Sequence, residues 1–433
     1  MMMACTLPLL LLSTAGDQPR WTAPPFNGTG VVGPAEAYGL RVAQGSSLAK
    51  LYNATPEMGV YSHGAMLGFH SGYFLASWKN GPMNEDTPGQ RVLWSYASAS
   101  SPLGYITPLV LFPNVSDGSG CATKDHGPYR PGNTAFLSPG CAHLFAEPLI
   151  ELNGRAYLAA SLRQYCLYPL DPLMDGGKYL LLRRVTTASS GSGTPQLGEM
   201  FWAADPGPEW APTSSRLNIR ALHQMDSDTQ SDIAALLAGQ RPCAGDATSS
   251  KCEFCEGGCQ DLRAAGAPDA PCALEDVGGP WIERTHWKVP HQETDVLVYR
   301  STKTTLDLCF SQRDGGANAT WSPPQATGLA DIHSNFNAGT LPDGRVYLLH
   351  NPIAASPHRR DPLVISLSTD GWSFDEAFVI TSCLLPPITS KGVTDGCARR
   401  NKGAGGHGPQ YPQGLVHGTS LYVIMSMNSE CDR

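Results

Sequence analysis

The chain has 433 residues, more than one small hydrophobic core usually organises, which leaves either two or three domains or one closed repeat architecture. Its formal net charge of −8 is spread without long runs of one sign, so the basic patch of a nucleic-acid-binding protein is not expected. Gly and Pro together make up about 19 % of the residues, more than a helical enzyme usually has and less than the share that marks disorder, which predicts a protein rich in turns.

The N-terminus has the pattern of a secretory signal peptide over residues 1–16. The apolar run Leu7–Leu12 is followed by the small residues 13–16, although no Lys or Arg precedes the run. No later run approaches the roughly 18 apolar residues of a membrane span. Export is also indicated by 13 cysteines, of which only Cys5 lies in the signal, and by four N-x-S/T sequons, at Asn27, Asn53, Asn114 and Asn318. We expect a soluble, disulfide-bonded glycoprotein that is secreted or held in the lumen of the secretory pathway.

From residue 58 onward, short apolar runs alternate with clusters of turn residues, as is typical of antiparallel strands. Asn153–Gly154 and Asp343–Gly344 each separate two such runs, and both predict two-residue hairpin loops that match the twist of the strands. One helix is predicted, from Ser231 to Ala238, with the polar residues 226–228 nearby to cap it. The pattern as a whole predicts an all-β fold.

Residues 240–275 differ in composition from the rest of the chain, with five cysteines among many Gly, Ala and Pro. We interpret them as an insertion between β-sheets. Cys252, Cys255 and Cys259 have a spacing that could hold zinc, with Cys243 or Cys272 as the fourth ligand. In an exported chain disulfides are the simpler interpretation, so a small disulfide-stapled loop without a metal is expected.

One turn motif occurs twice between residues 309 and 374: a strand ending in Ser, Asp and Gly, followed by an aromatic residue. The first copy contains Ser311, Asp314, Gly315, Gly316, Thr320 and Trp321, and the second contains Ser368, Asp370, Gly371 and Phe374. In such a turn the Asp and Ser side chains bond backbone N–H groups, glycine takes positive φ, and the ring seals the underside of the hairpin. Repetition at a period of tens of residues favours a stack of similar β-sheets, and most economically a propeller.

The segment from Glu293 to Phe374, together with GPQYPQGLVHGTSLYVIMS near the C-terminus, resembles the sialidase-like six-bladed β-propellers with BNR, or Asp-box, repeats. The resemblance implies a propeller over residues 17–433 that the cysteine-rich segment interrupts. In that family three arginines hold the carboxylate of an anionic sugar, a Tyr–Glu pair supplies the nucleophile for a retaining hydrolysis, and an Asp is the general acid/base. No cofactor is implied, and the expected partner is a glycan or glycoconjugate.

Carried over to this chain, the resemblance implies Tyr411 as the nucleophile, Glu293 as the carboxylate that polarises it, and Arg300 and Arg360 as substrate clamps. Asp86 lies in the right part of the chain for the acid/base, but its surroundings do not match, and the family's first arginine has no counterpart. Guanidinium groups bind carboxylates bidentately, and a phenol becomes a usable nucleophile when a neighbouring group takes its proton. Glu293 and Arg300 would face opposite ways on an unbroken strand, so a turn or a bulge is needed to bring them into one pocket.

Two other functions stay open. Propeller enzymes that cleave uronic-acid polysaccharides by β-elimination use His and Tyr as base and acid, with Arg neutralising the carboxylate. Candidate histidines are His63, His70, His126, His143, His333, His350, His407 and His417. The missing arginine and the unmatched Asp86 also fit a propeller that binds carbohydrate without catalysis. A carboxylate within hydrogen-bond reach of Tyr411 would favour hydrolysis, and a histidine facing Tyr411 would favour elimination.

Overall fold

The computed structural model describes residues 32–33, 36–37, 40–45, 47–52, 54–55, 57–82, 89–116, 142–164, 179–187, 193–238, 284–300, 307–315, 319, 321–322, 325–330, 334–352, 360–382 and 408–428. The predicted signal peptide over residues 1–16, the cysteine-rich segment 240–275 and Asp86 lie outside these ranges.

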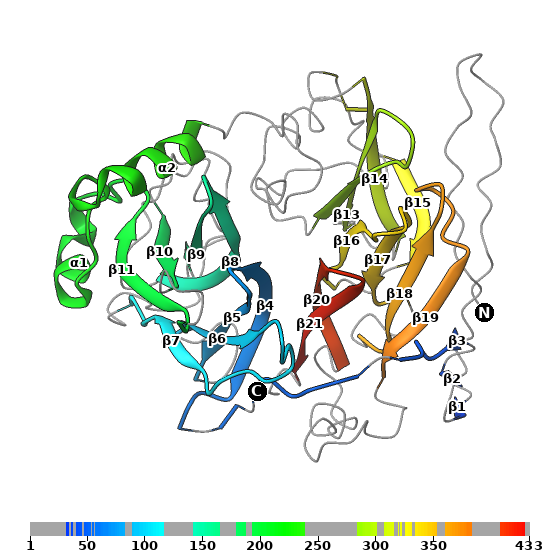
Figure 1. The fold of residues 1–433 in the computed structure, drawn as a ribbon, viewed down its shortest axis with the longest axis horizontal. Helices are drawn as coiled ribbons and strands as arrows, with labels where there is room; N and C mark the ends of the chain where they lie inside the picture. The colour runs from blue at the N-terminus through cyan, green and yellow to red at the C-terminus, as the bar shows by residue number, and fades with distance from the viewer. Residues whose placement is uncertain are drawn as a thin grey trace, which may run out of the picture.

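Four antiparallel sheets of four strands each make up most of the described β-structure, and in each sheet the strands are neighbours in their order along the sequence (Figure 1). The first sheet contains β4 (Tyr61–His70), β5 (Tyr73–Gly81), β6 (Arg91–Ser98) and β7 (Leu109–Phe112). The second contains β8 (Ala142–Leu152), β9 (Arg155–Gln164), β10 (Leu180–Thr186) and β11 (Gln196–Trp202). The third contains β12 (Arg284–Lys288), β13 (Thr294–Arg300), β14 (Asp307–Asp314) and β15 (Gln325–Ala330). The fourth contains β16 (Asn337–Thr340), β17 (Val346–His350), β18 (Leu363–Ser368) and β19 (Glu376–Thr381).

Two smaller sheets complete the β-structure of the described residues. The hairpin of β20 (Gly408–His417) and β21 (Ser420–Asn428) is one, and the other contains β1 (Val32–Gly33), β2 (Glu36–Ala37) and β3 (Leu40–Arg41). Val42, directly after β3, forms a parallel bridge with Val379 of β19, and the Ala43 N–H donates to the Val379 carbonyl at 2.9 Å. This N-terminal segment therefore runs along the outer edge of the fourth sheet.

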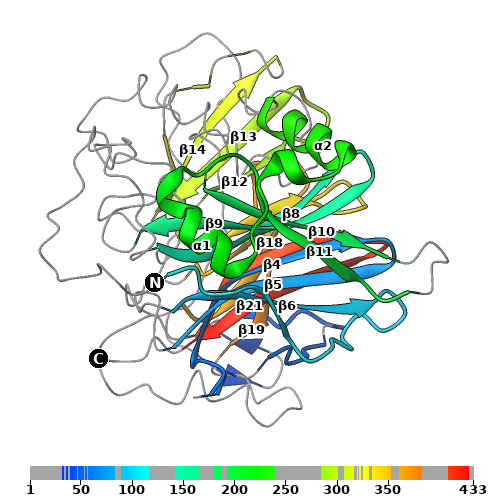
Figure 2. The same cartoon turned by 90° about the vertical axis from the view of Figure 1, so that its left-hand side faces the viewer.

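The first strand of each sheet packs against the first strand of its neighbour, in the order β12, β16, β20, β4, β8. Figure 1 shows the sheets following one another around an arc in this order, and Figure 2 shows the same arrangement from the side. Blades of a β-propeller are arranged in this way around the propeller axis. The all-β prediction is confirmed, whereas the number of six blades stays a prediction, because residues 239–283, between α2 and β12, lie outside the described ranges.

The hydrophobic core lies between neighbouring sheets. Trp94, Leu144 and Trp202 belong to a buried cluster that joins the first and second sheets, and Trp287 and Phe310 belong to one that joins the third and fourth. In β8 the side chains alternate between buried and half-buried, as expected for a strand with one face toward a core.

The second copy of the turn motif has the predicted bonds. The carboxylate of Asp370 accepts bonds from the backbone N–H groups of Trp372 (2.7 Å) and Ser373 (2.6 Å), and the Ser368 hydroxyl accepts one from Gly371 (2.8 Å). Burial acts to raise the pKa of Asp370, but these N–H bonds and the Ser368 hydroxyl outweigh burial and hold the pKa below its usual range. In the first copy the Asp314 carboxylate accepts from the hydroxyl of Thr294 at 2.5 Å instead, so that turn is tied to the neighbouring strand.

Gly371 is needed for two separate reasons. Its φ of 78° lies in the left-handed region, and an added Cβ would come 2.9 Å from Cδ of Pro290. We expect Gly371→Ala to lower the free energy of unfolding by about 2 kcal/mol. Gly418→Ala is the matched control, because Gly418 has a φ of 59° but nothing within 4 Å of an added Cβ, and we expect it to cost about 1 kcal/mol. Equal losses in denaturant unfolding would show that the contact with Pro290 is unimportant.

The two hairpin predictions had different outcomes. Asn153 (φ 50°) and Gly154 (φ 75°) form the two-residue turn between β8 and β9, as predicted. Between β16 and β17 the connection is longer, because the Gly344 N–H bonds the Leu341 carbonyl at 2.9 Å and β17 begins only at Val346. The prediction of a two-residue loop at Asp343–Gly344 was therefore wrong.

Two helices lie on the outer side of the second sheet, next to β11 (Figures 1 and 2). The predicted helix is confirmed as α2 (Ser227–Ala238), although it begins at Ser227 rather than Ser231, and the Asp226 carboxylate caps it through the Thr229 N–H at 2.9 Å. The other helix, α1 (Ala211–Leu217), was not predicted, because APTSSRL has no apolar periodicity. The short 3-10 helices η2 (Pro208–Trp210) and η3 (Leu222–Gln224) precede them. Neither α-helix in the described part of the chain is long and apolar enough to cross a bilayer.

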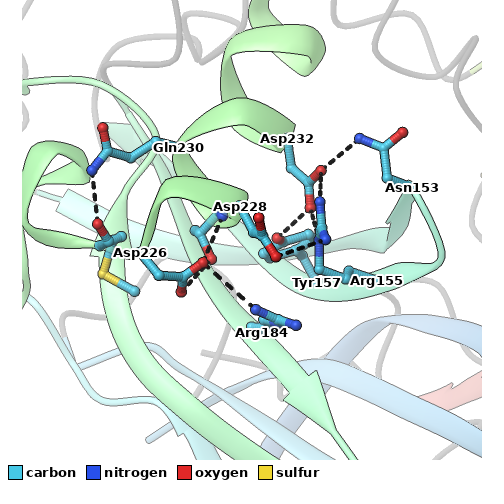
Figure 3. A network of polar contacts seen from close by, with 10 residues as sticks. Asn153, Arg155, Tyr157, Arg184, Asp226, Asp228, Gln230 and Asp232 are labelled. Atoms are coloured by element: carbon cyan, nitrogen blue, oxygen red, sulfur yellow. Dashed lines mark hydrogen bonds and ion pairs between the residues drawn. The ribbon is translucent and has the colours of Figure 1, made fainter.

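Helix α2 is joined to the β8–β9 hairpin by a buried carboxylate (Figure 3). Asp232 accepts bonds from Arg155 Nε and Nη2, each at 2.6 Å, from the Tyr157 hydroxyl at 2.6 Å and from Asn153 Nδ2 at 2.7 Å. Burial, followed by the bond to Asp232, raises the pKa of Tyr157 to about 12. The helix is thus tied to the second sheet by polar contacts as well as by apolar packing.

Candidate functional site

The strand directions bring several candidate residues to the same end of their sheets. Because neighbouring strands are antiparallel, the first and third strands of a sheet begin at the same end. His63 and Tyr411 lie near the starts of the first strands β4 and β20, and Arg360 lies shortly before the third strand β18. Arg300 is the last residue of the second strand β13, so its backbone lies at this end too. We call this end of the sheets, where His63, Tyr411, Arg360 and the backbone of Arg300 lie, the Tyr411 end.

Tyr411 lies at a break in the regular pairing of β20. Its φ of 53° is in the left-handed region, which is uncommon for a bulky residue and costs on the order of 1–3 kcal/mol. The pairing with β21 shifts between Gln410, opposite Ser426, and Gln413, opposite Ile424, so this segment carries a β-bulge. A bulge changes the direction of side chains that a regular strand would place on alternate faces, and this one lies at the candidate site.

Arg360 contacts both residues at the start of the bulge. Its Nη1 donates a hydrogen bond to Oε1 of Gln410, and its Cζ lies 5.0 Å from the centre of the Tyr411 ring, in a cation–π arrangement. Asn351 links the two backbone segments that carry these residues. Its Nδ2 donates to the carbonyls of Pro362, which follows Arg360, and Pro409, which precedes Gln410, at 2.9 Å each. The fourth sheet and β20 therefore hold the guanidinium against the phenol ring.

His63 contacts Tyr411 from the first sheet. The two ring centres are 3.9 Å apart with an interplanar angle of 66°, and His63 is only 4 % exposed. On β5, Lys79 is the cross-strand partner of His63, and its buried Nζ lies 3.6 Å above the ring of Phe145 in β8. The Tyr411 end thus gathers a phenol from the β20–β21 hairpin, an imidazole and a lysine side chain from the first sheet, and a guanidinium from the fourth sheet.

Glu293 lies elsewhere. It is in the turn between β12 and β13, where its backbone carbonyl accepts from Gly315 of the first turn motif at 3.1 Å. Its carboxylate pairs with Lys288 Nζ at 2.8 Å and is 78 % exposed. The pairing of β13 with β14 is unbroken from Thr294 to Arg300, so no turn or bulge returns Glu293 to the end where Arg300 lies. The structure does not bring Glu293 and Tyr411 together.

The other candidate histidines in the described ranges contact residues other than Tyr411, and His143 is buried with its ring centre 5.0 Å from that of Phe145. His350 is buried and its Nε2 lies 2.9 Å from the Ser366 hydroxyl. His70 pairs with Glu151 at 2.8 Å and His417 packs on Phe69, and both lie at the ends of their strands. His126, His333 and His407, like Asp86, lie outside the described ranges. In the ranges that are described, His, Cys, Asp and Glu side chains form no group of three suited to a metal ion.

Sequence reasoning missed Gln410 and Lys79. Gln410 precedes Tyr411 in GPQYPQGL, but a single glutamine has no sequence signature that marks a functional residue. Its contact with Arg360 depends on the bulge, which the sequence did not predict. Lys79 lies on β5, which is buried on both faces, so an alternating pattern gives no signal for it.

Residues 285–422 match the protein family described as a BNR repeat-like domain. Among solved structures, the chain is similar to a sialidase with 18 % identity and a TM-score of 0.55, over 88 % of this chain and 32 % of that one. The chain thus spans about a third of the length of that sialidase, and at this identity the likeness shows the fold. No curated protein sequence matches the chain.

Two further sialidase structures are similar at 10 % identity. They are the intramolecular trans-sialidase from Ruminococcus gnavus, with a TM-score of 0.41 over 77 % of this chain and 88 % of that one, and the Trypanosoma rangeli sialidase, with a TM-score of 0.36 over 86 % and 53 %. The family match over residues 285–422 and the fold of the first structure agree with the resemblance to sialidase-like proteins with BNR repeats that the turn motifs predicted.

Proposed function

We propose that the Tyr411 end binds an anionic sugar and that the chain is a sialidase-like glycoside hydrolase with Tyr411 as its nucleophile. The observation that carries the proposal is the position of the Arg360 guanidinium, 5.0 Å from the centre of the Tyr411 ring. A guanidinium is suited to bind a carboxylate with two parallel hydrogen bonds, and here it lies beside a group that can attack the sugar. Arg300, at the same end, is the second proposed clamp.

In the proposed reaction the Tyr411 oxygen bonds to the anomeric carbon while the glycosidic bond breaks, and the leaving oxygen takes a proton from an acid, for which Asp86 is the candidate. Water then releases the sugar from Tyr411. The phenol must lose its proton as it attacks. His63, whose ring lies against that of Tyr411, is the proposed acceptor of that proton, in the role that sequence reasoning gave to Glu293.

A second candidate is a lyase that cleaves uronic-acid polysaccharides by β-elimination. The contact of His63 with Tyr411 favours it, because elimination needs a base that removes the proton from the carbon next to the carboxylate and an acid that protonates the leaving oxygen, and Arg360 would neutralise the substrate carboxylate. The products distinguish the two reactions. Hydrolysis consumes water and releases a saturated sugar, whereas elimination leaves a double bond that ultraviolet absorbance detects.

The proposal is tested by binding. We expect the protein to bind an acidic sugar, N-acetylneuraminic or glucuronic acid, more tightly than its methyl ester, and Arg360→Ala to weaken binding of the acid by about 100-fold. Arg345→Ala is the matched control, because Arg345 pairs with Asp343 and Glu376 in the turn at the opposite end of the fourth sheet. Equal loss in both variants, or no preference for the acid, would contradict the proposed site. Binding without any product would favour a carbohydrate-binding protein.

A further inference from the structure

Gln410 is a buried amide whose role the proposed function leaves unassigned. It has no exposed surface, and its Oε1 accepts a hydrogen bond from Nη1 of Arg360. Its Nε2 is buried and donates to no group within the described residues. A buried donor without a partner destabilises the fold. The hydrogen bond that Oε1 accepts from the proposed clamp is therefore the interaction that could explain a glutamine at this position.

The bulge in β20 lets Gln410 and Tyr411 contact the same guanidinium. On a regular strand, successive side chains point to opposite faces, so two adjacent residues would not both reach Arg360. Here the left-handed Tyr411 follows Gln410 directly, with its ring near the guanidinium that Gln410 binds through Oε1. The guanidinium is thus oriented by two neighbouring residues of one strand.

The backbone around this contact is fixed on both sides. An added Cβ at Gly408 would lie 2.3 Å from the Arg360 carbonyl oxygen, so only glycine permits the backbone segments at residues 408 and 360 to lie this close together. On the other side of the bulge, Gln413 Oε1 accepts from the Leu67 N–H at 2.6 Å, and the Gly414 N–H donates to Asn337 Oδ1 at 3.0 Å. Contacts of the neighbouring residues with the first and fourth sheets therefore hold the backbone of residue 410 in place.

The charge of the acceptor decides what Arg360 can bind. A carboxylate at position 410 would occupy the same volume and would accept the same bond, but it would put a negative charge next to the guanidinium and repel a second carboxylate. An amide accepts the bond without adding that charge.

We propose that Gln410 is a specificity-determining positioning residue: it orients Arg360 for a substrate carboxylate and, being neutral, preserves the preference of the site for acidic over uncharged sugars. This inference rests on the proposed function, since it assumes that Arg360 binds the sugar carboxylate. Gln410 acts through Arg360 and is not itself assigned a step in the reaction.

The experiment compares Gln410→Glu and Gln410→Met with the wild-type protein by isothermal titration. The ligands are N-acetylneuraminic acid and glucuronic acid, each beside its methyl ester. We expect Gln410→Glu to reduce the preference for acid over ester at least about tenfold while it unfolds at no lower temperature than wild type, because a Glu would pair with Arg360. We expect Gln410→Met, which is neutral and of similar size, to weaken acid binding several-fold and to retain the preference for acid.

The outcomes separate the inference from the proposed function. If the wild-type protein shows no preference for either acid, the proposed function fails and the inference falls with it. If wild type prefers the acid and Gln410→Glu keeps that preference, the inference alone is overturned. Should Gln410→Glu not fold, Gln410→Met decides: unchanged acid affinity, or loss of the preference for acid, overturns the role of Gln410, and weaker binding with the preference retained supports it.

Discussion

Replacing Tyr411 with phenylalanine is expected to lower turnover of an acidic glycoside by at least about a thousandfold and to leave binding of the sugar nearly unchanged. The substitution removes one oxygen atom. The ring that contacts Arg360 and His63 remains, so the local packing and the orientation of the guanidinium should persist. A loss in kcat without a matching loss in affinity is the signature of a group that acts in the reaction and contributes little to ground-state binding.

Tyr422→Phe is the matched control for this experiment. Tyr422 lies on β21, the partner strand of β20, and its ring packs against Phe74 at 4.3 Å between ring centres, in the apolar cluster of the first sheet. The same atom is removed from the same hairpin, so turnover should stay within about twofold of wild type. If Tyr411→Phe retained full turnover, the phenol would not be the nucleophile. If both variants lost turnover alike, the effect would come from the hairpin as a whole.

Parts of this fold could be predicted from the sequence because the hydrogen bonds that form them join residues close to one another in the chain. The turn at Ser368, Asp370 and Gly371 was predicted correctly because every bond that closes it joins residues within a few positions. The Asn153–Gly154 hairpin was predicted for the same reason, since both residues adopt positive φ readily. The all-β class followed from the accumulation of such signals.

The site was harder to predict because its contacts join distant parts of the chain. Arg360 reaches Tyr411 through the packing of the fourth sheet on β20, and His63 reaches it from the first sheet. The family resemblance supplied Arg360 and Tyr411, and spacing alone would not have paired them. Glu293 shows the opposite case. Glu293 and Arg300 could share a pocket only if the strand between them were interrupted by a turn or a bulge. β13 is instead paired with β14 along the whole length of β13, so the two residues lie at opposite ends of the strand.

The Tyr411 end combines a strained backbone with several constraints that hold it. The left-handed Tyr411 would relax if the neighbouring strands let it, but Asn351 and the close approach at Gly408 fix the chain before it. Strained backbone conformations that the surrounding structure maintains are common at functional sites. A bulge of this kind can point neighbouring side chains to the same place, whereas a regular strand would point them to opposite faces. Here the side chains so directed are an amide and a phenol that contact one guanidinium.

Asp232→Asn is expected to cause the largest loss of stability among the substitutions considered, about 3 kcal/mol at neutral pH. The Asp232 side chain has no exposed surface, and its two oxygens accept four bonds from Arg155, Tyr157 and Asn153. An asparagine would turn an N–H group toward one of these donors and leave Arg155 facing a neutral group (Figure 3). Denaturant unfolding at pH 7 measures the loss, and circular dichroism tests whether α2 still forms.

The pH dependence gives a second test of the same network. The bonds from Arg155 are the largest cause that holds the pKa of Asp232 below its usual range; burial opposes them, and bonds from Tyr157 and Asn153 add to them. Because the folded-state pKa lies below the unfolded value of about 3.9, the stabilisation is fully present above that pH and is lost as the pH falls through the folded-state pKa. The difference between wild type and Asp232→Asn should therefore be constant from about pH 5 to 8 and shrink below about pH 4.

Asp228→Asn is the matched control, since it changes the same kind of residue on the same helix beside the same arginine. Asp228 lies 3.2 Å from Arg155 Nη1, but its side chain is 65 % exposed, so solvent screens the pair and the loss should be at most about 1 kcal/mol. A loss at Asp232 as small as that at Asp228 would mean that apolar packing, in the buried cluster that contains Ile233 and Phe201, holds α2 on the second sheet without help from the buried carboxylate. A large loss at Asp232 that does not change with pH would instead assign the effect to the N–H group that the amide turns toward a donor, because only a charge can be titrated away.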